Sequence, residues 1–147
     1  MTACPQMIAV MTPFPHAVRH DTPLNQAREF MREHNVRHLP VTRDGELAGI
    51  ISDRDITLML GPDLDYPDAE EVTVDEACVH QAFVVDVSAR LDSVLSVMVE
   101  RHLDAVVITR SVSTGDKLAG IFTTTDACRE FAATLARQYA IDGNSAA

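Results

Sequence analysis

The most constraining feature of this 147-residue chain is that its two halves repeat one another. With a shift of 67 residues, like residues coincide: Val18 with Val85, Leu24 with Leu91, Met31 with Met98 and Arg43 with Arg110. Beyond the next loop the shift becomes 71, and Leu47–Ile50 coincides with Leu118–Ile121. The second copy therefore has four extra residues (71 minus 67) between Arg110 and Leu118. We expect them in a hairpin loop, where insertions are tolerated.

Each copy predicts the same order of elements: a short extended stretch, an amphipathic helix, a β-hairpin and a second helix. In the first copy, Thr22–Pro23 offers an N-cap followed by proline at the first helical position. His38–Thr42 and Leu47–Ile51 predict the two strands of a hairpin, because an Asp-Gly turn lies between them. Ser52 is expected to cap a second helix that ends at Gly61.

The second copy repeats this order, with Ser88 as the expected cap of its first helix. Its predicted strands are Ala105–Thr109 and Leu118–Phe122, and a longer helix follows from Thr124 to Tyr139. The expected organisation is a first repeat (7–62), an acidic linker (63–71), a second repeat (72–140) and a flexible tail (141–147). Because about 60 residues can bury little core alone, we expect the copies to pack as one body.

Charge and composition exclude several classes of protein. The chain has 12 Lys and Arg against 22 Asp and Glu, and a net charge of -10 repels phosphate backbones, so we expect no nucleic-acid partner. A few arginines in one cleft can still hold a small anion. Three distant cysteines, Cys4, Cys78 and Cys128, indicate a reducing, cytoplasmic compartment. Apolar runs fall short of the roughly 18 to 20 residues that span a bilayer, which predicts no signal peptide and no membrane span.

The repeated unit resembles the CBS domain family, and the chain resembles a stand-alone CBS pair, or Bateman module. The motifs that carry the resemblance are Met31–Val41 and Gly49–Ile56 in the first copy and Gly120–Asp126 in the second. The resemblance implies an α/β (α+β) fold in which two tandem β-α-β-β-α repeats pack as one pseudo-symmetric module.

The resemblance also implies a function. CBS pairs act as regulatory sensors, so we expect an adenosine-containing nucleotide such as AMP, ADP or ATP to bind in the cleft between the repeats. No other cofactor is expected to be required. Binding would signal to a regulated partner protein by conformational change, and the chain would form a homodimer. The alternative is a structural adaptor for dimerisation or docking whose ligand sites are vestigial.

The resemblance assigns roles to individual residues. Asp55 and Asp126 would accept hydrogen bonds from ribose hydroxyls, and Ser52 and Thr123 would donate to phosphate at their helix starts. Arg54 would add a phosphate contact that makes the first site the stronger one. The full expected set of ligand contacts is Val18, Leu39, Pro40, Ser52, Arg54, Asp55, Val85, Thr123, Thr125 and Asp126. A Ser-x-x-Asp sequence is also close to a capping box, and capping and binding do not exclude one another.

Catalytic and metal-binding motifs find little support in the sequence. It has no Gly-x-Ser-x-Gly, His-Glu-x-x-His or phosphate-binding loop with Gly-Lys-Ser/Thr, so we predict that the chain is not an enzyme. Cys78 and His80 have the side chains of metal ligands but need a further residue from elsewhere to form a site. On spacing alone we predict no metal site.

Overall fold

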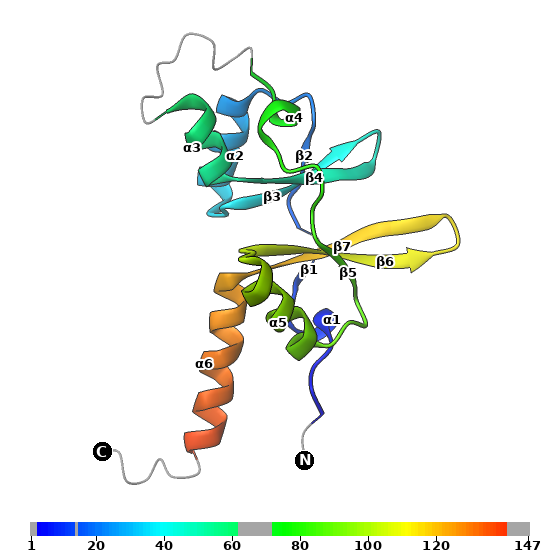
Figure 1. The fold of residues 1–147 in the computed structure, drawn as a ribbon, viewed down its shortest axis with the longest axis vertical. Helices are drawn as coiled ribbons and strands as arrows, with labels where there is room; N and C mark the ends of the chain where they lie inside the picture. The colour runs from blue at the N-terminus through cyan, green and yellow to red at the C-terminus, as the bar shows by residue number, and fades with distance from the viewer. Residues whose placement is uncertain (1–2, 14, 62–71, 141–147) are drawn as a thin grey trace.

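The two halves of the chain form two lobes, each a small sheet covered by helices (Figure 1). The computed structural model describes residues 3–13, 15–61 and 72–140. The helices are α1 (Met7–Val10), α2 (Leu24–His34), α3 (Asp53–Leu60), α4 (Val74–Ala77), α5 (Leu91–Arg101) and α6 (Thr124–Ala140). The strands are β1 (Thr12–Pro13), β2 (Val18–Arg19), β3 (His38–Arg43), β4 (Glu46–Ser52), β5 (Val84–Asp86), β6 (Ala105–Val112) and β7 (Gly115–Thr123). This is the mixed α and β fold that the repeated pattern predicts.

Each lobe has a parallel pair of strands followed by a hairpin. The first sheet has the order β2-β3-β4 and the second the order β1-β7-β6-β5. β2 runs parallel to β3, and β5 parallel to β6, because a helix connects the members of each pair. The Asp-Gly turn of the first hairpin is confirmed: Asp44 has φ 51° and Gly45 φ 81°, as a type I′ turn requires.

The four extra residues of the second copy lengthen its hairpin. Arg110 pairs with Lys117, and Val112 with Gly115, so both strands continue beyond the bounds that the sequence predicts. The hairpin extends past the body of its lobe (Figure 1). Both faces of this extension are exposed, so its sequence lacks the apolar alternation by which a strand is recognised.

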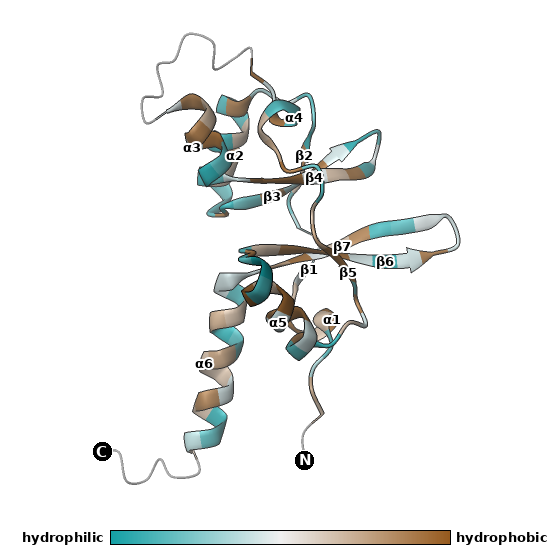
Figure 2. Ribbon diagram, in the orientation of Figure 1, coloured by the Kyte–Doolittle hydropathy of each residue, from teal (hydrophilic) through white to brown (hydrophobic). Residues whose placement is uncertain are grey.

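Each lobe has its own hydrophobic core, and the two copies exchange their leading segments. Met7 of the first copy is completely buried in the core of the second lobe. Val74 and Cys78 of the second copy belong to the core of the first lobe. Hydrophobic residues gather on the strands at the centre of each lobe and on parts of helices α3 and α5 (Figure 2). Because each core needs a segment from the other copy, the two repeats form one folded body.

Because of this exchange, the first helix of each repeat is capped differently from the prediction. The first amide of α2, at Leu24, donates to Val72 O at 2.9 Å, and the first amide of α5, at Leu91, donates to Pro5 O at 2.9 Å. The two bonds are equivalent, because the donors Leu24 and Leu91 are 67 residues apart and so are the acceptors Pro5 and Val72. Side chains of Thr22 and Ser88 therefore do not cap these helices, and the expectation that they would is wrong. Backbone carbonyls from the other copy satisfy the free amides instead.

Two equivalent glycines allow the exchanged segments to approach the sheets. A Cβ on Gly49 would lie 2.4 Å from Val79 O, and a Cβ on Gly120 would lie 2.7 Å from Thr12 O. Val79 forms a bridge with Ile50, next to Gly49, through two backbone hydrogen bonds of 2.9 and 3.0 Å. Glycine at these positions is thus required by close backbone contact.

Two expectations concern segments outside the described residues: the acidic linker and the tail beyond residue 140. Among the residues that the structure describes, no helix is both long and apolar enough to cross a membrane.

Candidate functional site

A cleft of about 790 Å³ lies where the second helix of each repeat begins. α3 follows directly from β4, and α6 follows directly from β7, so both helix starts point into the space between the lobes (Figure 1). The cleft is lined by Thr12, Asn35, Val36, Arg37, His38, Ser52, Asp53, Arg54, Asp104, Ile121, Thr123, Thr124, Thr125, Asp126 and Arg129. It therefore receives side chains from both repeats.

The start of α3 is a complete capping box. Ser52 Oγ accepts from the Asp55 amide at 3.0 Å, and Asp55 Oδ2 accepts from the Ser52 amide at 2.9 Å. The predicted cap is thus confirmed. The Asp53 amide donates to Arg37 O at 2.9 Å, which ties the loop before β3 to this helix start. Asp55 is not among the residues that line the cleft.

The start of α6 holds its aspartate with more partners. Asp126 Oδ2 accepts from the Thr123 amide at 2.9 Å and from Thr123 Oγ1 at 3.3 Å. Asp126 Oδ1 accepts from Thr12 Oγ1 at 3.1 Å and from the Arg129 guanidinium at 2.8 Å. Only 5 % of Asp126 is exposed, so these four hydrogen bonds compensate the burial of its charge. The carboxylate is consequently fixed at the wall of the cleft.

Two of these partners were missed in the sequence. Thr12 comes from the exchanged leading segment, more than 100 residues before Asp126, and no local pattern connects them. Arg129 lies three residues after Asp126 on the same helix, and that spacing was a usable signal for an ion pair. The Arg129 side chain is 69 % exposed, so it can move away from Asp126 at little cost.

The charged residues around the cleft are of both signs. They are Arg37, Asp53, Arg54, Asp104, Asp126 and Arg129. His38 also lines the cleft, and burial lowers the pKa of its imidazole below the usual 6.5, although Asp104 and Asp55 oppose this shift. His38 is therefore largely neutral at pH 7 and offers one donor and one acceptor nitrogen. No pattern in the sequence marks His38 as a residue of the cleft.

Half of the predicted ligand contacts lie in this cleft: Ser52, Arg54, Thr123, Thr125 and Asp126. Val18, Leu39 and Pro40 are buried in the first lobe, because β2 and β3 face its core. Val85 lies on β5 beside Ile108 and packs on the second core. The structure thus brings together the two helix starts and leaves Asp55 and the strand residues outside the cleft. A ligand contact at each of the ten positions stays a prediction.

Comparisons with known proteins agree with the repeated fold. A family model described as CBS domain matches residues 8–61 and 71–133. Hypoxic response protein 1 of Mycobacterium tuberculosis is 34 % identical over 112 residues, which is 75 % of this chain and 73 % of that protein.

Two solved structures also resemble the chain. CBSX2 in complex with AMP is 25 % identical, with a TM-score of 0.72, over 88 % of this chain and 97 % of that one. Hypoxic Response Protein I with two coordinated zinc ions is 28 % identical, with a TM-score of 0.66, over 85 % of this chain and 98 % of that one.

Proposed function

Because the chain belongs to the CBS domain family, we propose that it is a regulatory module that binds an adenosine-containing nucleotide of the AMP, ADP or ATP type between its repeats. The observation that carries the proposal is the convergence of two helix starts and three arginines on one cleft of about 790 Å³. Pockets for small ligands have volumes of about 300 to 1,000 Å³. The AMP complex of a similar protein, CBSX2, supports this choice of ligand class.

The phosphate end of the ligand would lie at the helix starts. Arg54 and Thr125 occupy the first turns of α3 and α6, where backbone amides have no acceptor within their own helix. Such amides and the positive end of the helix dipole favour an anion. Arg37 and Arg54 supply formal positive charge from the first repeat, and Arg129 supplies it from the second. A phosphate group can thus be bound by this otherwise acidic protein.

The ribose end would bind at Asp126. A carboxylate has about four acceptor positions, and Asp126 already accepts four hydrogen bonds. A ribose hydroxyl must therefore displace one donor, and the exposed Arg129 is the easiest to displace. We propose that ribose replaces Arg129 at Asp126 and that the released guanidinium binds the phosphate. This exchange would link ligand binding to the side chains at the start of α6.

The signal would pass through the contact between the repeats. The ligand would contact α3 of one repeat and α6 of the other, and would therefore stabilise one arrangement of the two. We propose that the chain acts without catalysing a reaction, that it forms a homodimer and that a separate protein responds to the bound state. CBS domains are generally regulatory modules rather than enzymes.

A dimerisation or docking adaptor is the second candidate, and exposed apolar residues on the helices favour it. Val99 on α5 is 76 % exposed and Phe131 on α6 is 65 % exposed. Large apolar side chains that are exposed to this extent mark a protein contact when they form one patch. Met31 on α2 is buried and does not contribute to an exposed apolar surface.

Thermal unfolding with AMP, ADP, ATP, NAD and S-adenosylmethionine at millimolar concentrations tests the first proposal. A ligand at 100 times its dissociation constant should stabilise the fold by about 2.7 kcal/mol, and a domain of this size should then melt several degrees higher. An unchanged melting temperature with all five compounds would support the adaptor and contradict the sensor. Light scattering at tens of micromolar checks the dimer.

A further inference from the structure

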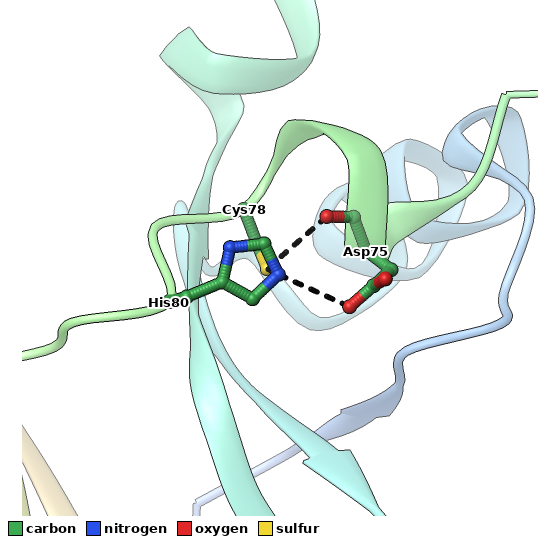
Figure 3. Close-up of side chains that lie close together, drawn as sticks. All are labelled: Asp75, Cys78 and His80. Atoms are coloured by element: carbon green, nitrogen blue, oxygen red, sulfur yellow. Dashed lines mark hydrogen bonds and ion pairs between the residues drawn. The ribbon is translucent and has the colours of Figure 1, made fainter.

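Asp75, Cys78 and His80 bring three potential metal ligands together in the first lobe (Figure 3). One ligand atom of each residue lies within 4.8 Å of the other two. None of the three residues lines the cleft between the repeats. We propose that this cluster binds Zn²⁺ through the Asp75 carboxylate, the Cys78 thiolate and His80 Nε2.

Two of the three ligand separations in the cluster suit a tetrahedral zinc ion. Zn–N bonds of about 2.0 Å and Zn–S bonds of about 2.3 Å at a tetrahedral angle place nitrogen and sulfur about 3.5 Å apart, and nitrogen and oxygen about 3.3 Å apart. Cys78 Sγ lies 3.6 Å from His80 Nε2, and Asp75 Oδ1 lies 3.1 Å from the same nitrogen. A sulfur, nitrogen and oxygen ligand set also favours zinc over magnesium or calcium.

The backbone around the cluster is held before any metal binds. The amides of Val74 and Asp75 donate to Thr22 O at 2.8 Å and His20 O at 2.9 Å. Cys78 ends α4, and the next residue, Val79, is bonded on both sides to Ile50 of β4. The three ligands are thus carried by a segment fixed to the first lobe, which lowers the entropic cost of ordering them.

Hydrogen bonds already connect the three side chains in the absence of metal. With its proton on Nε2, His80 donates to Asp75 Oδ1 at 3.1 Å, and the Cys78 thiol donates to the Asp75 carbonyl oxygen at 3.8 Å. A metal ion would replace these bonds, because all three side chains would then act as lone-pair donors to the same cation.

Protonation governs how the ion binds. Burial and the neighbouring Asp75 raise the pKa of the Cys78 thiol, so this group is protonated at pH 7 in the absence of metal. On binding, the S–H bond breaks, an S–Zn bond forms and the proton leaves to the buffer. His80 and Arg43 lower the pKa of Asp75, which is therefore already ionised.

Arg43 opposes metal binding at this site. Its guanidinium lies 3.0 Å from Asp75 Oδ1, so a cation must share or replace this ion pair. The His80 side chain is 56 % exposed, which leaves room for water as a fourth ligand. The site therefore has the features of an exchangeable zinc site rather than a closed structural one.

The test is a titration of the metal-free, full-length protein with Zn²⁺ in competition with a chromophoric chelator. Wild type should bind one equivalent, and Cys78→Ser and His80→Gln should each lower the affinity by at least about tenfold. Cys128→Ser and His102→Asn are matched controls and should leave the affinity unchanged, because Cys128 is exposed and Asn suits the left-handed backbone of His102.

Three further measurements test the proposal if Cys78→Ser folds poorly. Co²⁺ in place of Zn²⁺ should give the near-ultraviolet charge-transfer band of a thiolate ligand, and Arg43→Gln should bind Zn²⁺ several-fold more tightly than wild type. Zn²⁺ should also raise the melting temperature of wild type but not that of His80→Gln. Wild-type affinity in His80→Gln, or a Co²⁺ complex without the thiolate band, would overturn the proposal.

Discussion

The second helix of each repeat begins with the same motif, yet only one of the two aspartates lies in the cleft. Ser52–Asp55 and Thr123–Asp126 each end a strand and start a helix. Among the residues that the structure describes, Asp55 bonds only to the start of its own helix, whereas Asp126 also bonds to residues beyond the motif. The motif therefore determines the helix start, and its surroundings determine which carboxylate faces the cleft.

The differing surroundings can be traced to two substitutions between the copies. Thr12 and Arg129, which bond Asp126, have Val79 and Leu58 as their counterparts in the other lobe, by the shifts of 67 and 71. Valine and leucine carry no polar side-chain atom. The two helix starts therefore differ at these two positions, and only the aspartate with the polar neighbours lines the cleft.

The exchanged leading segments differ in the same way. Met7 and Val74 are equivalent and each is completely buried in the opposite lobe. Beyond them the copies diverge, since the ligands of the proposed zinc site correspond to Ile8, Met11 and Pro13 in the first copy. A shared packing function is thus preserved in both segments, while metal-binding side chains occur in one.

The largest expected effect concerns the exchange itself. Met7→Ala should lower the free energy of unfolding by about 2 to 5 kcal/mol, because it empties a core position in the second lobe. Ile8→Ala in the same helix is the control and should change it by less than about 0.5 kcal/mol, since Ile8 is half-exposed. Urea unfolding measures both. A Met7→Ala protein as stable as the control would show that the leading segment does not pack as described.

The next effect concerns the two aspartates. Asp126→Asn should weaken AMP binding by about 10- to 100-fold, the loss of a charge-assisted hydrogen bond worth about 1.5 to 3 kcal/mol. Asp55→Asn should change it by less than about threefold, because Asp55 does not line the cleft. Calorimetry on both variants measures the difference. A greater loss in Asp55→Asn, the order that the sequence suggests, would move the main site to the first repeat.

A smaller effect on the free energy of unfolding is expected when the surroundings of Asp126 are made to resemble those of Asp55. Thr12→Val removes the hydroxyl that bonds Asp126 and should lower the free energy of unfolding by about 1 kcal/mol. The reverse change in the other lobe, Val79→Thr, should have less than half this effect. Equal changes in urea unfolding of the two variants would mean that the Thr12 hydrogen bond contributes nothing specific.

The smallest effect is the pH dependence due to His38, whose counterpart in the second copy is Ala105. Burial lowers the pKa of His38 in the folded protein below 6.5, so the unfolded chain binds the proton more strongly. The free energy of unfolding should therefore decrease as the pH falls below 6.5 towards the folded-state pKa. His38→Gln should show a shallower decrease between about pH 7 and 5 in urea unfolding. An unchanged slope would contradict this assignment.

Local structure was predictable wherever a single segment determined it. The Asp44–Gly45 turn, the Ser52 cap and the end of α3 at Gly61 depend on neighbouring residues, and the structure confirms all three. The expected Thr22 and Ser88 caps failed because carbonyls of Val72 and Pro5 reach those helices from the other copy. Segments that exchange between lobes leave no periodic signal.

In the candidate site, too, the residues of the local motifs were predictable and those from distant segments were not. Ser52, Arg54, Thr123, Thr125 and Asp126 are found at the cleft because the repeated motif defines both helix starts. Thr12 and Arg37 line it through loops and exchanged segments, whose positions depend on how the lobes pack. The sequence did not indicate that Asp75 lies beside Cys78 and His80, because their proximity depends on the short helix α4 and the turn that follows it.

The central claim, a nucleotide bound at the two helix starts between the repeats, is tested most directly by titrating isotope-labelled protein with AMP and following backbone amide resonances. The largest shifts should occur at Arg54, Thr125 and Asp126, with an accompanying shift of the Arg129 side chain as it leaves Asp126. The backbone amide resonance of His80, which lies outside the cleft, should not shift. Shifts confined to other surfaces, or none at saturating AMP, would contradict the claim.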